Sequence, residues 1–113
     1  MEFQELKEKV IQWAEERGIF EKGEPLAQLE KTQEELDETI NAIEEIQDLH
    51  HHPNKPDFNE VDGIMDGIGD MLVTIIILAS MMNLEIEDCL EVAYNEIKNR
   101  TGKMVDGQFV KDR

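Results

Sequence analysis

Acidic residues recur at helical spacing in two separate segments of the chain. In the first segment, Glu34, Glu35 and Glu38 fall within a helical pattern, where residues three or four apart share one face. In the second, Asp66 and Asp70 lie one helical turn apart. If the two helices pack together, these carboxylates converge, and they repel one another unless a divalent cation lies among them. The spacing therefore points to a cation site made of hard oxygen ligands.

The alternative for such acidic stripes is a solvated helix face, which is common in a chain this rich in Asp and Glu. The position of Asp70 argues against that alternative. Asp70 directly precedes an apolar run over residues 71–79, and an acidic residue is rarely buried without a partner. We therefore expect Asp70 to have either a solvent edge or a bound cation.

Length and charge restrict the class of protein. The chain has 113 residues, which predicts one domain over residues 1–113. Its formal net charge of −16 makes nucleic-acid binding unexpected, because the chain repels phosphate backbones. The single cysteine, Cys89, excludes a disulfide within the chain and is expected to pack as a small apolar residue. Because no signal peptide is visible and the run 71–82 is shorter than a bilayer span, we expect a cytoplasmic protein without a membrane partner.

Periodicity predicts an all-α fold with a short β element at its end. The fold class expected is a four-helix bundle-type subunit with a short C-terminal β-hairpin or extended tail, completed by oligomerisation. Oligomerisation is expected because the run 71–82 is apolar on all sides, and so small a chain cannot cover it alone. The helices are predicted over residues 1–17, 25–49, 57–82 and 84–99, with a connector over 19–24 and the hairpin over 104–110.

The second predicted helix carries an apolar stripe, which we expect to face the core of the subunit. Its members share three- and four-residue spacing: Leu26, Leu29, Leu36, Ile40, Ile43 and Ile46. A comparable stripe on the last helix consists of Ile86, Leu90, Ala93, Tyr94 and Ile97.

Several further residues have both a structural and a functional interpretation. Trp13 is either a core anchor or a wall that stacks on a nucleotide base. Lys31 pairs either with a substrate phosphate or with Glu35. Three adjacent histidines, 50–52, could bind a transition metal, although neighbours on a loop converge poorly. Groups able to bind phosphate oxygens gather near the end of the last helix, where ordinary basic residues are also common: Asn95, Lys98, Arg100 and Lys103.

In order along the chain, these motifs resemble those of the MazG-like nucleotide pyrophosphohydrolases, within the all-α NTP pyrophosphatases. The resemblance extends roughly from Trp13 to Lys103. It rests on three segments: Gln28-Leu29-x-Lys31-x-x-Glu34-Glu35-x-x-Glu38, then Gly69-Asp70 opening an apolar helix, then Asn95-x-x-Lys98-x-Arg100.

The resemblance implies a Mg²⁺-dependent enzyme that hydrolyses a nucleoside triphosphate to the monophosphate and pyrophosphate, with Mn²⁺ as a possible substitute. It implies that Glu35, Glu38 and Asp70 bind the metal, with Glu34 beside them. From the chemistry of the reaction, we expect a carboxylate that is not used as a ligand, either Glu34 or Glu35, to act as general base. It also implies phosphate contacts from Asn95, Lys98 and Arg100, and a homodimer or homotetramer as the active unit.

The chain departs from the family pattern at one position. The family motif E-x-x-D has a Glu three residues before the Asp, and Gly67 stands there in this chain. Asp66 is adjacent and could replace that Glu with a shorter reach, so the number of metal ions stays open. The alternative function is therefore a catalytically weakened nucleotide-binding protein or a structural helical oligomer.

Overall fold

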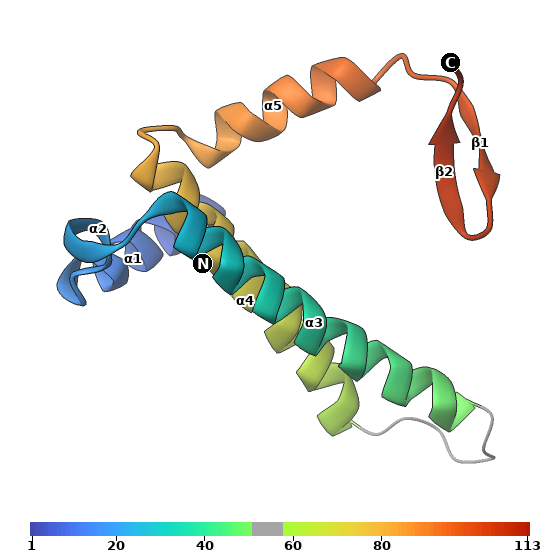
Figure 1. The fold of residues 1–113 in the computed structure, drawn as a ribbon, viewed down its shortest axis with the longest axis horizontal. Coiled ribbons are helices and arrows are strands. Elements are labelled where there is room, and N and C mark those ends of the chain that lie inside the picture. The colour runs from blue at the N-terminus through green and yellow to red at the C-terminus, as the bar shows by residue number, and fades with distance from the viewer. Residues whose placement is uncertain (51–57) are drawn as a thin grey trace. The chain divides into compact units, whose positions relative to one another are not determined.

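A computed structural model describes residues 1–50 and 58–113 of the chain. The protein is mostly helical (73%), and the described residues form five helices followed by a two-stranded antiparallel hairpin (Figure 1). The helices are α1 (Phe3–Glu16), α2 (Ile19–Lys22), α3 (Pro25–His50), α4 (Phe58–Met81) and α5 (Ile86–Ile97), and the strands are β1 (Gly102–Val105) and β2 (Gln108–Lys111). The chain divides into two compact units, Met1–Asn83 and Leu84–Arg113, each described here by itself. The expectation of a single domain stays a prediction.

The helix boundaries follow local chemistry. Helix α1 ends where Gly18 adopts a left-handed conformation, with φ of 75°. Helix α3 begins at Pro25. Proline suits this position because the N–H groups in the first turn of a helix have no intrahelical acceptor, so the N–H that proline lacks is not needed. Asn83 adopts a left-handed conformation, with φ of 58°, and marks the end of α4. The connector expected over 19–24 instead contains the single-turn helix α2, whose formation Gly18 permits.

Within the first unit, α3 and α4 lie side by side and antiparallel, and α1 packs against α4 (Figure 1). The buried apolar core is small and consists of Ala14 on α1 with Ile76, Ile77 and Ala79 on α4. Residues Asp62–Met81 of α4 are also long and apolar enough, by length and composition, to cross a membrane, a property that core helices share.

Polar residues form much of the contact between α3 and α4. Gln28, Thr39 and Thr74 are each less than 10% exposed. The Gln28 side-chain Nε2 donates to the Thr74 carbonyl oxygen at 3.1 Å, and the hydroxyls of Thr32 and Thr74 are hydrogen-bonded at 2.8 Å. These bonds satisfy polar groups that burial would otherwise leave without partners.

The prediction that the apolar stripe of α3 faces the core of the subunit is wrong. Leu26 is 76% exposed, and the next four members of the stripe are between 40% and 46% exposed; Ile46 is half-buried. The α3 face that meets α4 carries Gln28, Thr32, Glu35 and Thr39 instead. Thr39 fits closely against Gly67, and Gln28 and Thr32 form hydrogen bonds with Thr74.

In the second unit, α5 has no buried residue, and the apolar stripe expected in a core is largely exposed, with Leu90 at 71%. Cys89 is a half-buried free thiol. The hairpin matches its prediction. Asp106 and Gly107 have φ of 50° and 82°, so the two-residue turn is of the type that favours Asp-Gly.

Candidate functional site

Glu35 is the most unusual carboxylate among the described residues. It lies on α3 and is half-buried, and its Oε2 atom is buried without a hydrogen-bond partner. Burial raises the pKa of Glu35, and the negative charges of Glu38 and Asp70 raise that pKa further. A buried, unpartnered carboxylate oxygen surrounded by like charges is a poor structural element but a good cation ligand.

The packing of α4 on α3 supplies the second carboxylate. Asp70 is exposed, but its charge acts on Glu35 across the helix pair. Both residues line one cavity of about 430 Å³. Trp13 from α1, Lys31 from α3 and Thr74 from α4 also line it. The structure therefore brings four of the predicted site residues to one cavity: Trp13, Lys31, Glu35 and Asp70.

Trp13 is a cavity wall and not a buried anchor, since it is 44% exposed. It also lines a second cavity, of about 380 Å³, together with Lys9, Val10 and Asp70. The guanidinium of Arg17 lies 4.3 Å from the ring centroid and its Nη1 donates to the Trp13 carbonyl oxygen at 3.2 Å. This contact restricts the orientation of the indole.

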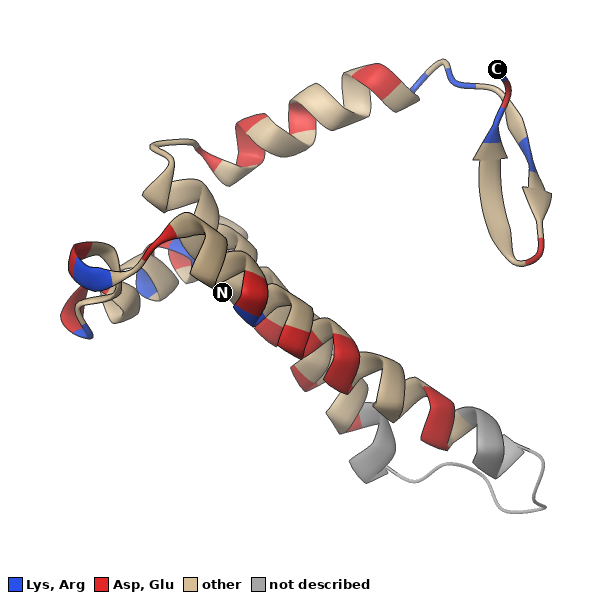
Figure 2. Ribbon diagram, in the orientation of Figure 1, with Lys and Arg blue, Asp and Glu red and all other residues tan. Residues whose placement is uncertain are grey.

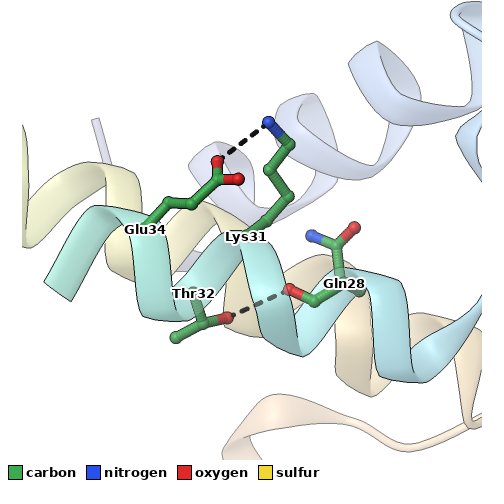
Figure 3. Close-up of polar contacts among 4 residues, drawn as sticks. All are labelled: Gln28, Lys31, Thr32 and Glu34. Carbon is green, nitrogen blue, oxygen red and sulfur yellow. Dashed lines mark hydrogen bonds and ion pairs between the residues drawn. The ribbon is translucent and has the colours of Figure 1, made fainter. Parts of the chain in front are cut away.

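Lys31 pairs with the first glutamate of the motif. Its Nζ lies 3.1 Å from Glu34 Oε2, and the two side chains point toward each other on the surface of α3 (Figure 3). The hydrogen bond and charge of Glu34 raise the pKa of Lys31. The sequence-based alternative paired Lys31 with Glu35, whose charge also raises this pKa but by less. Acidic residues recur along the rest of α3 (Figure 2).

Gly67 lies where the family motif has a Glu. A Cβ atom added to Gly67 would overlap Thr39 Oγ1 and lie 3.2 Å from the Thr39 Cβ atom. A glutamate at this position would therefore require Thr39 to move. Asp66 is exposed one turn before Asp70, and the charges that act on Glu35 come from Glu34, Glu38 and Asp70.

The arrangement of donors fits a metal ion only in part. Within residues 1–50 and 58–113, no group of three or more His, Cys, Asp or Glu side chains is close enough together to hold one. The unpartnered Oε2 of Glu35 and the hard oxygen donors beside it nevertheless suit Mg²⁺, which prefers carboxylates and keeps several waters. Two carboxylates and waters are enough for such a site.

The predicted phosphate-binding residues outside α3 belong to the second unit. Asn95, Lys98, Arg100 and Lys103 are all exposed. Lys98 Nζ donates to the Asn95 side-chain oxygen at 3.3 Å, which is consistent with their three-residue spacing at the end of α5. His51 and His52 lie outside the described residues, as does the His50 side chain.

Sequence reasoning gave no site role to four residues near the candidate site, although Gln28 begins the first motif of the resemblance. Gln28 and Thr74 line the larger cavity, Lys9 lines the smaller one, and Arg17 covers Trp13. Lys9 and Arg17 each lie four residues from Trp13, so helical spacing could have identified them. Nothing in the spacing alone distinguishes Thr74 from a threonine in a purely apolar helix.

Comparison with known proteins yields one distant relative. Over 84 residues the chain is 32% identical to an uncharacterised 18.2-kDa protein from the rep–hol intergenic region of Haemophilus phage HP1 (strain HP1c1). The match covers 74% of this chain and 44% of the phage protein, so the chain spans less than half the length of that relative. No protein-family model and no solved structure matches the chain.

Proposed function

We propose that the protein is a Mg²⁺-dependent nucleoside triphosphate pyrophosphohydrolase, able to use Mn²⁺ as well, that converts an NTP or dNTP to the monophosphate and pyrophosphate. The observation that carries the proposal is the Glu35 carboxylate. Its buried Oε2 has no partner, and it shares a cavity with Asp70 and Trp13. The order of the sequence motifs, which resembles that of the MazG-like enzymes, adds to this support.

In this proposal, Glu35, Glu38 and Asp70 hold the metal, and Asp66, one helical turn before Asp70, is a further candidate ligand. A bound Mg²⁺ supplies an activated water and neutralises phosphate charge. We propose Glu34, which is not among these ligands, as the group that accepts a proton from the attacking water once Lys31 leaves its ion pair to contact a phosphate. A net charge of −16 makes neutralisation by a cation a requirement for binding a triphosphate.

The substrate is positioned by groups of two kinds. Trp13 offers an aromatic face at the cavity, and such faces stack on bases. Lys31 is the cation at the same cavity. Asn95, Lys98, Arg100 and Lys103 are proposed to contact the substrate phosphates.

We further propose that the active unit is a homodimer or homotetramer. The support is the amount of apolar surface that the subunit leaves exposed, including most of the stripe on α3 and, on α4, Met65 at 65% and Ile68 at 49%. Soluble proteins rarely expose such surface without a partner.

One observation favours the alternative of a weakened nucleotide-binding protein. Thr39 occupies the space that a side chain at position 67 would need, so the first carboxylate of the second family motif has no direct equivalent. Such a protein would bind Mg²⁺ and nucleotide without turnover.

The test is a panel of the common NTPs and dNTPs, assayed with and without Mg²⁺, with separation of monophosphate plus pyrophosphate from diphosphate plus phosphate. Mg²⁺-dependent monophosphate and pyrophosphate from any nucleotide would support the proposal. Diphosphate would contradict the assigned bond. Nucleotide binding without any product would favour the alternative.

A further inference from the structure

Helices α3 and α4 approach closely where Thr39 faces Gly67. Thr39 is 5% exposed, and its hydroxyl donates to the Glu35 carbonyl oxygen at 2.8 Å. The Thr39 side chain leaves no room for a Cβ atom at position 67, because such an atom would overlap Oγ1 and lie only 3.2 Å from the Thr39 Cβ atom. The hydrogen bond fixes the Thr39 side chain, so it cannot easily turn away.

This contact lies one helical turn from the candidate metal ligands on both helices. Thr39 follows Glu35 by four residues on α3, and Gly67 precedes Asp70 by three residues on α4. At a rise of about 1.5 Å per residue, these offsets correspond to roughly 6 and 4.5 Å along the helix axes. Because helices are stiff over one turn, the separation at Thr39 and Gly67 determines the separation of Glu35 from Asp70.

Gly67 differs from the other two glycines of α4 in having no space for a side chain. A Cβ atom added to Gly63 or Gly69 would meet no atom within 4 Å. A glycine inside a helix costs about 1 kcal/mol relative to alanine. At position 67, close packing against Thr39 explains why the helix has a glycine despite this cost.

We propose that Thr39 and Gly67 are positioning residues, whose contact sets the distance between α3 and α4 and so places Glu35 and Asp70 together to bind a divalent cation. The inference rests on the proposed function, since it concerns the same carboxylates. Neither residue supplies a ligand. Their effect on the cation passes through the helix spacing.

The test measures the binding of Mn²⁺ alone to the full chain, and the electron paramagnetic resonance signal of the free ion reports how much Mn²⁺ is unbound. Gly67→Ala should weaken Mn²⁺ binding by about tenfold, the lower end of the effect of residues that orient metal ligands. Gly63→Ala is the matched control, because it makes the same substitution on the same helix in open space, and it should bind as the wild type does. Gly67→Ala combined with Thr39→Ala removes the overlapping hydroxyl and should recover most of the affinity.

Equal Mn²⁺ affinity in Gly67→Ala and Gly63→Ala would overturn the inference, and so would a wild type that does not bind Mn²⁺. The nucleotide panel is read separately. Mn²⁺ binding that depends on Gly67, without turnover of any nucleotide, would support the positioning role and contradict the proposed function. If circular dichroism shows that Gly67→Ala does not fold, Thr39→Val is used instead. In this variant a methyl group, larger than the hydroxyl it replaces, presses on Gly67 from the other helix. An unchanged Mn²⁺ affinity of Thr39→Val would overturn the inference.

Discussion

Two neighbouring faces of α3 differ in what they pack against. The face that meets α4 is polar and holds Gln28 and Thr39, both at least nine-tenths buried. The adjacent face is apolar, and its Leu36 and Ile40 are about two-fifths exposed. Close approach and satisfied hydrogen bonds accompany the face that lies against α4, and the apolar stripe is left exposed, which is why we propose it as the contact surface of the oligomer.

The largest effect is expected from the carboxylates beside the polar face. Glu38→Gln should reduce turnover by more than about 100-fold, since even residues that only orient metal ligands contribute 10–100-fold. Glu30→Gln, an exposed glutamate on the same helix, is the control and should leave turnover unchanged. Steady-state assays with the best nucleotide of the panel measure both. Full turnover by Glu38→Gln, with unchanged helical content, would rule out its place in the site.

The apolar face is tested by its effect on assembly. Leu36→Glu places a charge in the exposed stripe and should shift the protein from oligomer to monomer, because an unpaired charge is costly inside an apolar interface. Size-exclusion chromatography with light scattering measures the mass. Gln33→Glu adds the same charge to an exposed polar position of α3 and should leave the mass as it is. An identical mass for both variants would show that this stripe is not the interface.

A smaller effect is expected from the hydrogen bonds of the polar face. Thr74→Val keeps the shape of the side chain but removes the hydroxyl that contacts Thr32 and the Met71 carbonyl oxygen. The free energy of unfolding should fall by roughly 0.5–1.5 kcal/mol, the usual net contribution of an intramolecular hydrogen bond, because Thr32 keeps its bond to the Gln28 carbonyl oxygen. Urea denaturation measures the change.

Thr101→Val is the matched control, because the Thr101 hydroxyl is exposed and bonds Asp112 at 2.8 Å. It should cost clearly less than Thr74→Val. A Thr74→Val variant as stable as the wild type would mean that these hydrogen bonds do not hold the helix pair together.

The smallest effect concerns the charge of Glu35. Burial and neighbouring carboxylates raise the pKa of Glu35 above its ordinary value of 4.5, so the folded state holds this proton more tightly than the unfolded state does. Stability therefore falls as pH rises from 4.5 through the raised pKa, and it is recovered on acidification.

Glu35→Gln removes this charge, so in Mg²⁺-free buffer at neutral pH its Tm should be higher than that of the wild type. The difference should shrink as pH falls toward 4.5. Thermal melts across this range measure it. A lower Tm for Glu35→Gln at neutral pH would contradict the idea that an uncompensated carboxylate is buried here.

Local features of the fold were predictable from the sequence. The left-handed Gly18 and Asn83, the first-turn Pro25 and the Asp106-Gly107 turn each act through the chemistry of one or two residues. Helix content and the hairpin followed from these signals and from periodicity. The single turn of α2 was missed because four residues are too few to show a period.

The candidate site was predictable in part. The motifs identified Lys31, Glu35 and Asp70, and Trp13 was a candidate only through its aromatic face; the structure places all four at one cavity. The resemblance put Glu35 among the metal ligands and Glu34 beside them, but the residue pattern did not predict that Glu35 is half-buried with an unpartnered oxygen while Glu34 is exposed and paired with Lys31. Which of two adjacent residues faces a neighbouring helix depends on how that helix packs.

The sequence by itself determined the helical class, the helix ends, the hairpin turn and the set of acidic residues that could act together, because each depends on residues near in the chain. Only the tertiary structure decided which face of α3 lies against α4. That face is joined to α4 by contacts between residues that are far apart in the chain and that no periodic pattern links, among them the close fit of Thr39 to Gly67 and the hydrogen bonds of Gln28 and Thr32 to Thr74. In our proposal, the fit of Thr39 to Gly67 sets where Glu35 and Asp70 lie relative to each other.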